Sequence, residues 1–268
     1  MKVPKLLAAL AALGLGAGCS IADPQRPGWL EVHSHPSADW IAATPGWVLG
    51  LGAGKTKLFK YPGGWDNPWE QYMVVEARQM AADQATIWTL NADGAVLRWA
   101  GPHGAPAPLT NGGGITRFAV SAAGEVHVLA LDHPQGLVDG RLVDTPCTAR
   151  AARALAIGSA GTYLVTVEGK LALESRAGSC DDLAAPFQAA DIAAVDLVGG
   201  HFTVAAVDNH NDAWLRRPDG GWEQLPRPIS YRPGYRPRSK PVEQLALSAF
   251  ALWARTVDGS VFLFADPR

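Results

Sequence analysis

The sequence repeats a short pattern in which an aromatic residue lies six positions before a glycine and an acidic residue lies directly before that glycine. Three segments share this pattern without gaps: Trp88-Thr-Leu-Asn-Ala-Asp-Gly94, Tyr163-Leu-Val-Thr-Val-Glu-Gly169 and Trp253-Ala-Arg-Thr-Val-Asp-Gly259. An acidic residue and a glycine between two apolar runs favour a β-hairpin, because glycine adopts the positive φ that tight turns need. The pattern therefore predicts three hairpins.

Looser copies of this unit occupy the rest of the chain, with onsets near residues 47, 87, 126, 162, 202 and 252. A repeat of about 40 residues with three or four short strands is typical of a β-propeller blade. A sandwich or a barrel would also contain many short strands, but neither explains six evenly spaced units. We therefore predict an all-β chain that forms a β-propeller of six blades.

The last unit ends at Arg268, one strand after its hairpin, and so lacks the outer strand expected in each blade. The segment Trp29-Leu-Glu-Val32, near the N-terminus, would supply this strand. Such an exchange would close the ring and cover the exposed sheet edges. We expect an N-terminal strand to complete the last blade.

Two segments carry a family resemblance. Residues 87–99 (Ile87-Trp-Thr-Leu-Asn-Ala-Asp-Gly-Ala-Val-Leu-Arg-Trp99) and residues 213–222 resemble tectonin repeats. The resemblance implies a six-bladed propeller of a kind that is often lectin-like or that recognises surface glycans. Because the motif residues mostly pack the blade, the resemblance assigns no binding residue.

The first twenty residues have the organisation of a secretory signal, with Lys2 and Lys5 before an apolar run over 6–16. Leu15-Gly-Ala-Gly-Cys19 resembles the lipobox of bacterial lipoproteins, in which a peptidase cuts before an acylated cysteine. The match departs at Gly16, where the family usually has leucine. The alternative is ordinary cleavage after residue 22, which would discard Cys19. Ser20 after the cysteine implies delivery to the outer membrane.

We accordingly expect a lipoprotein signal peptide over residues 1–18, a short tether over 19–27 and a single propeller domain over 28–268. No second apolar run reaches eighteen residues. The expected membrane contact is therefore the lipid on Cys19 alone, on the periplasmic or the surface face of the outer membrane.

Cys147 and Cys180 remain as a pair once Cys19 is acylated or removed. In an exported protein such a pair favours a disulfide, which would add roughly 3 kcal/mol to stability by closing the loop between them. A metal site or a reactive thiol is the alternative, but no His or Cys flanks either residue at ligand spacing.

Charge and motifs exclude several classes of function. The 23 basic and 25 acidic residues give a net charge of −2, which does not suit a nucleic-acid-binding protein. Residues 50–56 resemble a P-loop, but Leu49 stands where the first glycine belongs, so we interpret them as a hairpin turn. We expect no cofactor.

Two short clusters are weak metal candidates. His33 and His35 lie on the same side of an extended segment, whereas Asp208 and Asp212 lie where the hairpin turn of the fifth unit belongs. Turn conformation alone explains Asp and Asn at that place.

The segment 227–241, which we call the basic arm, is the most distinctive part of the chain outside the repeats. Its candidate binding residues are Tyr231, Arg232, Tyr235, Arg236 and Arg238. Four prolines are expected to keep it out of a sheet. In a four-stranded blade it starts and ends on the face of the middle hairpins, and that face also carries Asp93, Glu168, Asp208, Asp212 and Asp258. The arm is either a solvated loop paired with these acids or a recognition loop for an acidic partner.

Trp65 and Trp69 lie in a connector that should reach the opposite face, where tryptophan can form a platform for a sugar or pack against its own blade.

The leading hypothesis is a non-catalytic recognition propeller on the outer membrane, with a glycan or an envelope or secreted protein as its ligand, including an inhibitory or immunity role. The alternative is a hydrolase or lyase of the propeller type, with a metal or acid cluster in the central channel.

Overall fold

A computed structural model describes residues 28–32, 37–43, 48–52, 57–61, 69–82, 86–101, 104–110, 112, 114–121, 123–195, 203–230, 236–248 and 251–265. The expected signal peptide, Cys19 and the tether therefore lie outside the described residues, as do His33, His35 and Trp65. Among the described residues no helix is long and apolar enough to span a membrane.

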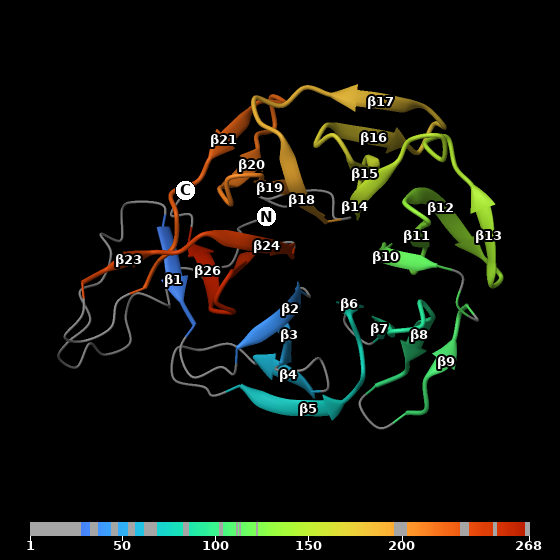
Figure 1. Cartoon of the computed structure of the whole chain (residues 1–268), viewed down its shortest axis with the longest axis horizontal. Helices are drawn as coiled ribbons and strands as arrows, with labels where there is room; N and C mark the ends of the chain where they lie inside the picture. The colour runs from blue at the N-terminus through green and yellow to red at the C-terminus, as the bar shows by residue number, and fades with distance from the viewer. Residues whose placement is uncertain are drawn as a thin grey trace, which may run out of the picture.

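Six four-stranded antiparallel sheets are arranged in a ring, which confirms the predicted six-bladed β-propeller (Figure 1). The first three blades consist of β2 (Ala38–Ala43), β3 (Val48–Gly52), β4 (Lys57–Tyr61) and β5 (Glu70–Val74); β6 (Gln79–Ala82), β7 (Ile87–Leu90), β8 (Val96–Trp99) and β9 (Ala107–Pro108); and β10 (Ile115–Val120), β11 (Val126–Ala130), β12 (His133–Val138) and β13 (Arg141–Asp144).

The fourth and fifth blades follow the same order from the axis outwards. They consist of β14 (Ala152–Gly158), β15 (Gly161–Thr166), β16 (Leu171–Ser175) and β17 (Cys180–Leu183); and β18 (Ala189–Ala194), β19 (Val204–Asp208), β20 (Ala213–Arg216) and β21 (Trp222–Gln224). The pairing of β3 with β4 confirms that the P-loop-like segment joins two strands of a hairpin.

The sixth blade takes its outer strand from the other end of the chain. It consists of β24 (Val242–Leu247), β25 (Leu252–Thr256), β26 (Val261–Ala265) and β1 (Gly28–Glu31). Trp29 pairs with Phe264 across the antiparallel ladder, and their rings meet edge to face at 5.0 Å. The predicted closure of the ring by an N-terminal strand is confirmed.

The apolar core is divided among the junctions between blades. Each of its six clusters of buried residues combines side chains from two neighbouring blades, including the junction between the sixth blade and the first. A blade is too thin to bury apolar groups alone, so each sheet covers the face of the next. The ring is thus held together by the same contacts that form its core.

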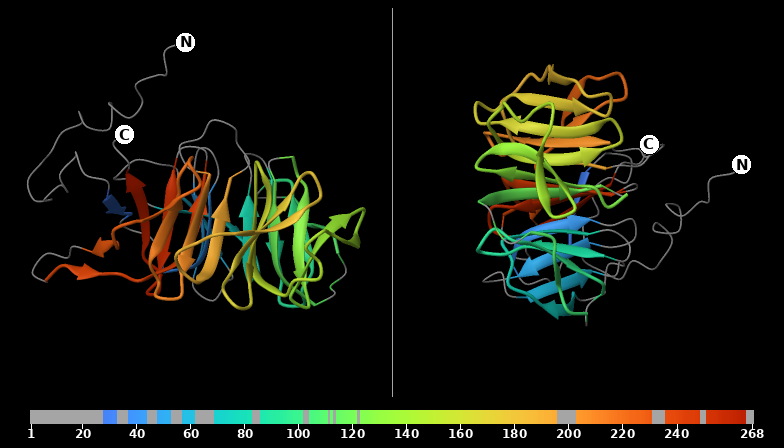
Figure 2. Two further views of the ribbon diagram at one scale, coloured as in Figure 1. Left: turned by 90° about the horizontal axis from the view of Figure 1, so that it is seen from above. Right: turned by 90° about the vertical axis from the view of Figure 1, so that its right-hand side faces the viewer.

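The middle hairpins turn as the repeated pattern predicts. Gly94, Gly169 and Gly259 have φ values of 79°, 81° and 79°, which require glycine at the end of each turn. The backbone N–H of the first turn residue also donates to the carbonyl of the residue that precedes the inner strand of the same blade. In the fourth blade, Val167 N donates to Ala151 O at 3.2 Å. The middle hairpins and the connectors between blades therefore share one face, here called the hairpin face (Figure 2).

The inner strands keep a common register around the axis. In five blades a bulge separates the first strand residue from the third, for example between Ile115 and Arg117 and between Ala189 and Asp191. When the inner strands are aligned on this register, all six blades carry an alanine at one position: Ala42, Ala81, Ala119, Ala156, Ala193 and Ala246. A small side chain suits this place because the inner strands of a propeller converge at the axis.

Candidate binding sites

The basic arm forms a short hairpin, which corrects the expectation that its prolines keep it out of a sheet. The strands β22 (Ile229–Ser230) and β23 (Arg238–Ser239) pair with each other outside the ring, and β22 lies against β1 (Figure 1). The four paired residues are not prolines. Pro228 takes part only through its carbonyl, which accepts from Lys240 N at 2.8 Å and needs no N–H of its own.

Both ends of the arm are fixed to the hairpin face by ion pairs. Arg227 pairs with Asp212 and also donates from Nη2 to the carbonyl of His210 at 3.0 Å, and Lys240 pairs with Asp258. Partial burial alone would raise the pKa of Asp258, but hydrogen bonds from Lys240, Thr256 and Ser260 together hold that pKa well below its usual range. The predicted pairing of the arm with the acids of this face is confirmed at these two places.

The rest of the described arm carries unpaired positive charge. Arg236 and Arg238 are exposed, and neither makes an ion pair within the part of the chain that the structure describes. The other candidate binding residues, Tyr231, Arg232 and Tyr235, lie outside the described residues.

Trp69 is a blade-packing residue, so its assignment as a ligand platform is wrong. Its side chain is only 8% exposed and belongs to the cluster that contains Ile41 and Val48. A Cβ atom on Gly50 would come within 3.0 Å of the indole ring, so the ring fills the space that glycine leaves on the neighbouring strand. Burial of so large a ring leaves no face for a sugar to stack on.

Asp208 and Asp212 act as turn residues. Oδ1 of Asp208 accepts from the backbone N–H groups of His210 and Asp212, and its Oδ2 accepts from Trp214 Nε1 at 2.9 Å. Asn211 has a φ of 63°, as expected for Asn in a tight turn. Within the described ranges no three His, Cys, Asp or Glu side chains gather as metal ligands would.

A set of polar side chains at the axis was missed by the sequence analysis. Two residues before the alanine that the six inner strands share, the chain carries Trp40, Gln79, Arg117, Ala154, Asp191 or Gln244. Arg117 of the third blade lies 4.8 Å from the centre of the Trp40 ring of the first blade. A contact that passes over the second blade requires both side chains to point towards the axis.

Three of these six side chains fasten one blade to the next. Gln79 donates from Nε2 to Phe118 O at 2.6 Å and accepts from Phe118 N at 3.1 Å. Gln244 makes the same pair of bonds to Ile41, at 2.9 Å each, and Trp40 Nε1 donates to Met80 O at 3.0 Å. The sixth, first and second blades therefore use this position to hold the ring together.

Asp191 has a different environment. Burial raises its pKa to about 6, although Arg117, the backbone N–H of Ile192 and Arg255 act in the opposite direction. Arg255 is itself committed, because it pairs with Glu243 at 2.9 Å and donates to Gln244 at 3.4 Å. Burial of this carboxyl near an unpaired guanidinium is the kind of arrangement that proteins keep at functional sites.

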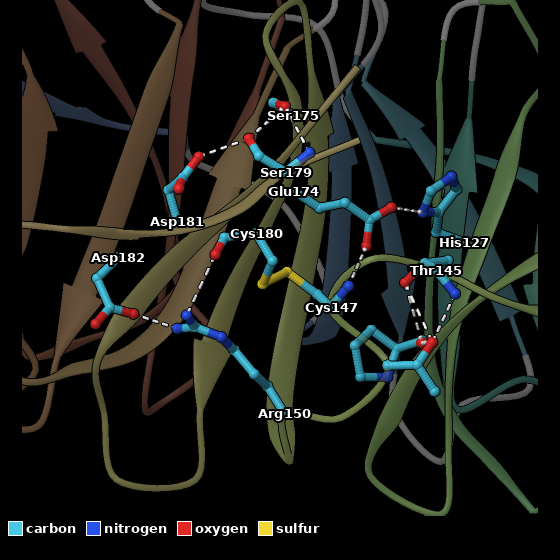
Figure 3. Close-up of a disulfide and its surroundings, with 12 residues drawn as sticks. His127, Thr145, Cys147, Arg150, Glu174, Ser175, Ser179, Cys180, Asp181 and Asp182 are labelled. Atoms are coloured by element: carbon cyan, nitrogen blue, oxygen red, sulfur yellow. Dashed lines mark hydrogen bonds and ion pairs between the residues drawn. A yellow bond between two sulfur atoms is a disulfide. The ribbon is translucent and has the colours of Figure 1, made fainter. Parts of the chain in front are cut away.

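The disulfide between Cys147 and Cys180 is confirmed, and it fastens the connector after the third blade to the outer strand of the fourth (Figure 3). Arg150 supports this link, since it pairs with Asp182 and donates to Cys180 O at 3.3 Å. Cys147 N donates to Oε2 of the buried Glu174 at 3.3 Å. The cysteines therefore have a structural role.

His127 lies beside this disulfide but is not arranged for acid–base catalysis (Figure 3). Its Nδ1 is 3.0 Å from Thr162 Oγ1 and 3.9 Å from Glu174 Oε1. A catalytic relay needs the hydroxyl on one ring nitrogen and the carboxylate on the other. Burial lowers the pKa of His127 despite the nearby Glu174. These contacts link the third and fourth blades.

Comparison with solved structures supports the fold alone. No protein-family model matches the chain, and no curated protein does. The structure titled "YCF48 bound to D1 peptide" covers 92% of this chain and all of its own length at 10% identity, with a TM-score of 0.60. Virginiamycin B lyase from Staphylococcus aureus covers 90% of this chain and 99% of its own length at 11% identity, with a TM-score of 0.61.

A third neighbour is the WD40 β-propeller domain of Doa1, which covers 89% of this chain and 97% of its own length at 10% identity, with a TM-score of 0.56. These neighbours include a peptide-bound protein and a lyase, so the likeness does not distinguish between binding and catalysis. The chain is a six-bladed β-propeller, which is the fold that its resemblance to tectonin repeats predicted.

Proposed function

We propose that this chain is a non-catalytic recognition propeller that binds an acidic surface of an envelope or secreted protein through the basic arm. The observation that carries the proposal is the division of charge along the arm. Arg227 and Lys240 are neutralised by Asp212 and Asp258, whereas Arg236 and Arg238 are exposed without an ion pair in the described chain. The ion pairs of Arg227 and Lys240 position the arm, and the positive charges of Arg236 and Arg238 remain available to a partner.

The arm has the physical properties of a preorganised binding element. Its hairpin register and the two ion pairs fix its base, so binding would order fewer residues and cost less conformational entropy. Arginine suits this role because its planar guanidinium binds a carboxylate through two parallel hydrogen bonds. An inhibitory or immunity role against a secreted protein is one form of this function.

The choice of a protein as the ligand draws on one neighbour of the same fold. YCF48, which shares the fold, has a structure with a bound peptide. The hydrolase or lyase alternative draws support from virginiamycin B lyase at the level of the fold, but among the described residues we find no metal-ligand group and no histidine relay to carry it.

The tether belongs to the same proposal. Trp29 Nε1, on the closing strand β1, donates to Pro226 O at 2.6 Å, so the base of the arm is attached to the strand that follows residues 19–27. A lipid on Cys19 would therefore hold the arm and its partner close to the membrane. We expect Cys19→Ser to move the protein from the membrane fraction to the soluble envelope fraction. An unchanged membrane fraction would rule out this anchor.

The experiment is a capture of partners from envelope extracts, with the full chain in detergent as bait. We expect Arg236→Ala with Arg238→Ala to lose the captured protein. Arg141→Ala with Lys170→Ala is the matched control, because it removes two exposed charges elsewhere in the ring. Equal capture by both double variants would overturn the role of the arm, and a captured glycan in place of a protein would overturn the class of partner.

A further inference from the structure

The axis of the ring carries a second feature that the proposed function does not use. Among the residues two positions before the shared alanine of the inner strands, Trp40, Gln79 and Gln244 bind the next blade through hydrogen bonds. Arg117 and Asp191 do not. The symmetry of the ring is broken where the third, fourth and fifth blades meet the axis.

Arg117 has free capacity to bind an anion. The guanidinium lies over the Trp40 ring, and within the described chain the Arg117 side chain makes no hydrogen bond or ion pair. The Trp40 indole is itself fixed by Met80 O, so the guanidinium rests on a rigid surface. Stacking leaves the N–H groups at the edge of the guanidinium plane free for a carboxylate.

Asp191 has free capacity to bind a cation. Its carboxyl accepts from Ile192 N, but no basic side chain of the described residues lies within ion-pair distance of it. Arg117 on β10 and Arg255 on β25 influence it from further away, and Glu243 on β24 opposes them. Since Arg255 is already paired with Glu243, Asp191 and Arg117 are, among the described residues at this position of the inner strands, the two charged side chains without an ion pair.

The fourth blade separates these two charges. Its residue at the same position is Ala154, whose small buried side chain adds no polar group between Arg117 and Asp191. Arg117 and Asp191 are themselves partly accessible to solvent. A ligand on this side of the axis would therefore meet a positive group at one end and a negative group at the other.

We infer that the axis is a binding site for a small zwitterion, whose carboxylate is held by Arg117 and whose ammonium group is held by Asp191. A ligand with one charge would leave one of the two side chains unmatched in a partly buried place, which costs free energy. A zwitterion satisfies both. The site is separate from the basic arm and does not depend on the proposed protein partner.

The test is calorimetric titration of the full chain with ω-amino acids from glycine to 6-aminohexanoate. Each is compared with the alkanoate and the alkylamine of the same chain length, because these keep one charge and remove the other. We expect at least one ω-amino acid to bind about tenfold or more tightly than both of its analogues, a difference of one logarithmic unit in Kd. Absence of any such preference overturns the inference.

Variants assign the two roles. Arg117→Gln should remove the preference over the alkylamine, and Asp191→Asn should remove the preference over the alkanoate. The Arg236→Ala, Arg238→Ala double variant is the control and should keep both preferences, so failure of the arm proposal would leave this result unchanged. A preference that survives in both axis variants overturns the assignment.

Discussion

The guanidinium of Arg117 on the third blade lies 4.8 Å from the centre of the Trp40 ring on the first blade. The two residues occupy the same position of their inner strands, and their contact passes over the second blade. The contact places a charged side chain at the axis of the ring. Elsewhere at the axis, glutamine side chains bind the next blade and alanine side chains line the inner strands.

Asp191→Asn is expected to stabilise the protein at neutral pH. The folded-state pKa of about 6 lies above the ordinary value of 3.8, so the contribution of Asp191 to stability is lost as the pH rises from about 4 to about 6. The variant should therefore gain on the order of 1–2 kcal/mol at pH 8, after allowance for the water that reaches this carboxyl.

Chemical denaturation of both proteins at pH 8 and pH 4 checks this prediction. At pH 4 the carboxyl of the folded wild type is protonated, and the difference between the two proteins should nearly disappear. A variant less stable than wild type at pH 8 would show that the ionised carboxylate is stabilised by a partner.

Trp29→Ala is expected to weaken the closure of the ring. The change removes the edge-to-face contact with Phe264 and the hydrogen bond to Pro226 O, so a loss of about 3 kcal/mol is expected. Leu30→Ala is the matched control, because Leu30 lies on the same strand and is only partly buried. Thermal unfolding compares the two, and equal midpoints would contradict the closing role of Trp29.

Loss of the disulfide should lower stability without altering the axis site. Replacement of Cys147 and Cys180 by serine is expected to cost roughly 3 kcal/mol, because the loop between them is no longer closed in the unfolded chain. A reducing agent should lower the unfolding midpoint of wild type and leave that of the double variant unchanged. Equal sensitivity of the two proteins to the reducing agent would contradict this account.

The sequence predicted the ring well because its signals are local. The Asp-Gly and Glu-Gly turns at Gly94, Gly169 and Gly259 recur at a fixed distance from an aromatic residue, and their positive φ values follow from residue type alone. The exchange of the N-terminal strand was predicted because the sixth repeat contains only three strand-like runs. The segment that contains Trp29 was the candidate for the fourth strand, and the pairing of Trp29 with Phe264 confirms it.

The axis could not be recognised from local motifs. Arg117 and Asp191 lie on the third and fifth blades, with the whole fourth blade between them, and each is a single charged residue within an apolar strand. A signal was nevertheless present, because aligning the inner strands on Ala119, Ala193 and their equivalents brings these two charges to one position. The arm shows a different limit, since a count of prolines overlooked the four residues between them that form a ladder.

The dissociation constant of the captured protein partner tests the central claim most directly, measured for wild type and for the double variant Arg236→Ala, Arg238→Ala at low and high salt. We predict binding at least about tenfold weaker for the double variant at low salt, and a smaller difference at high salt because exposed charges are screened. The Arg141→Ala, Lys170→Ala control should bind as wild type does. Equal affinity of wild type and the arm variant at low salt would contradict recognition through the basic arm.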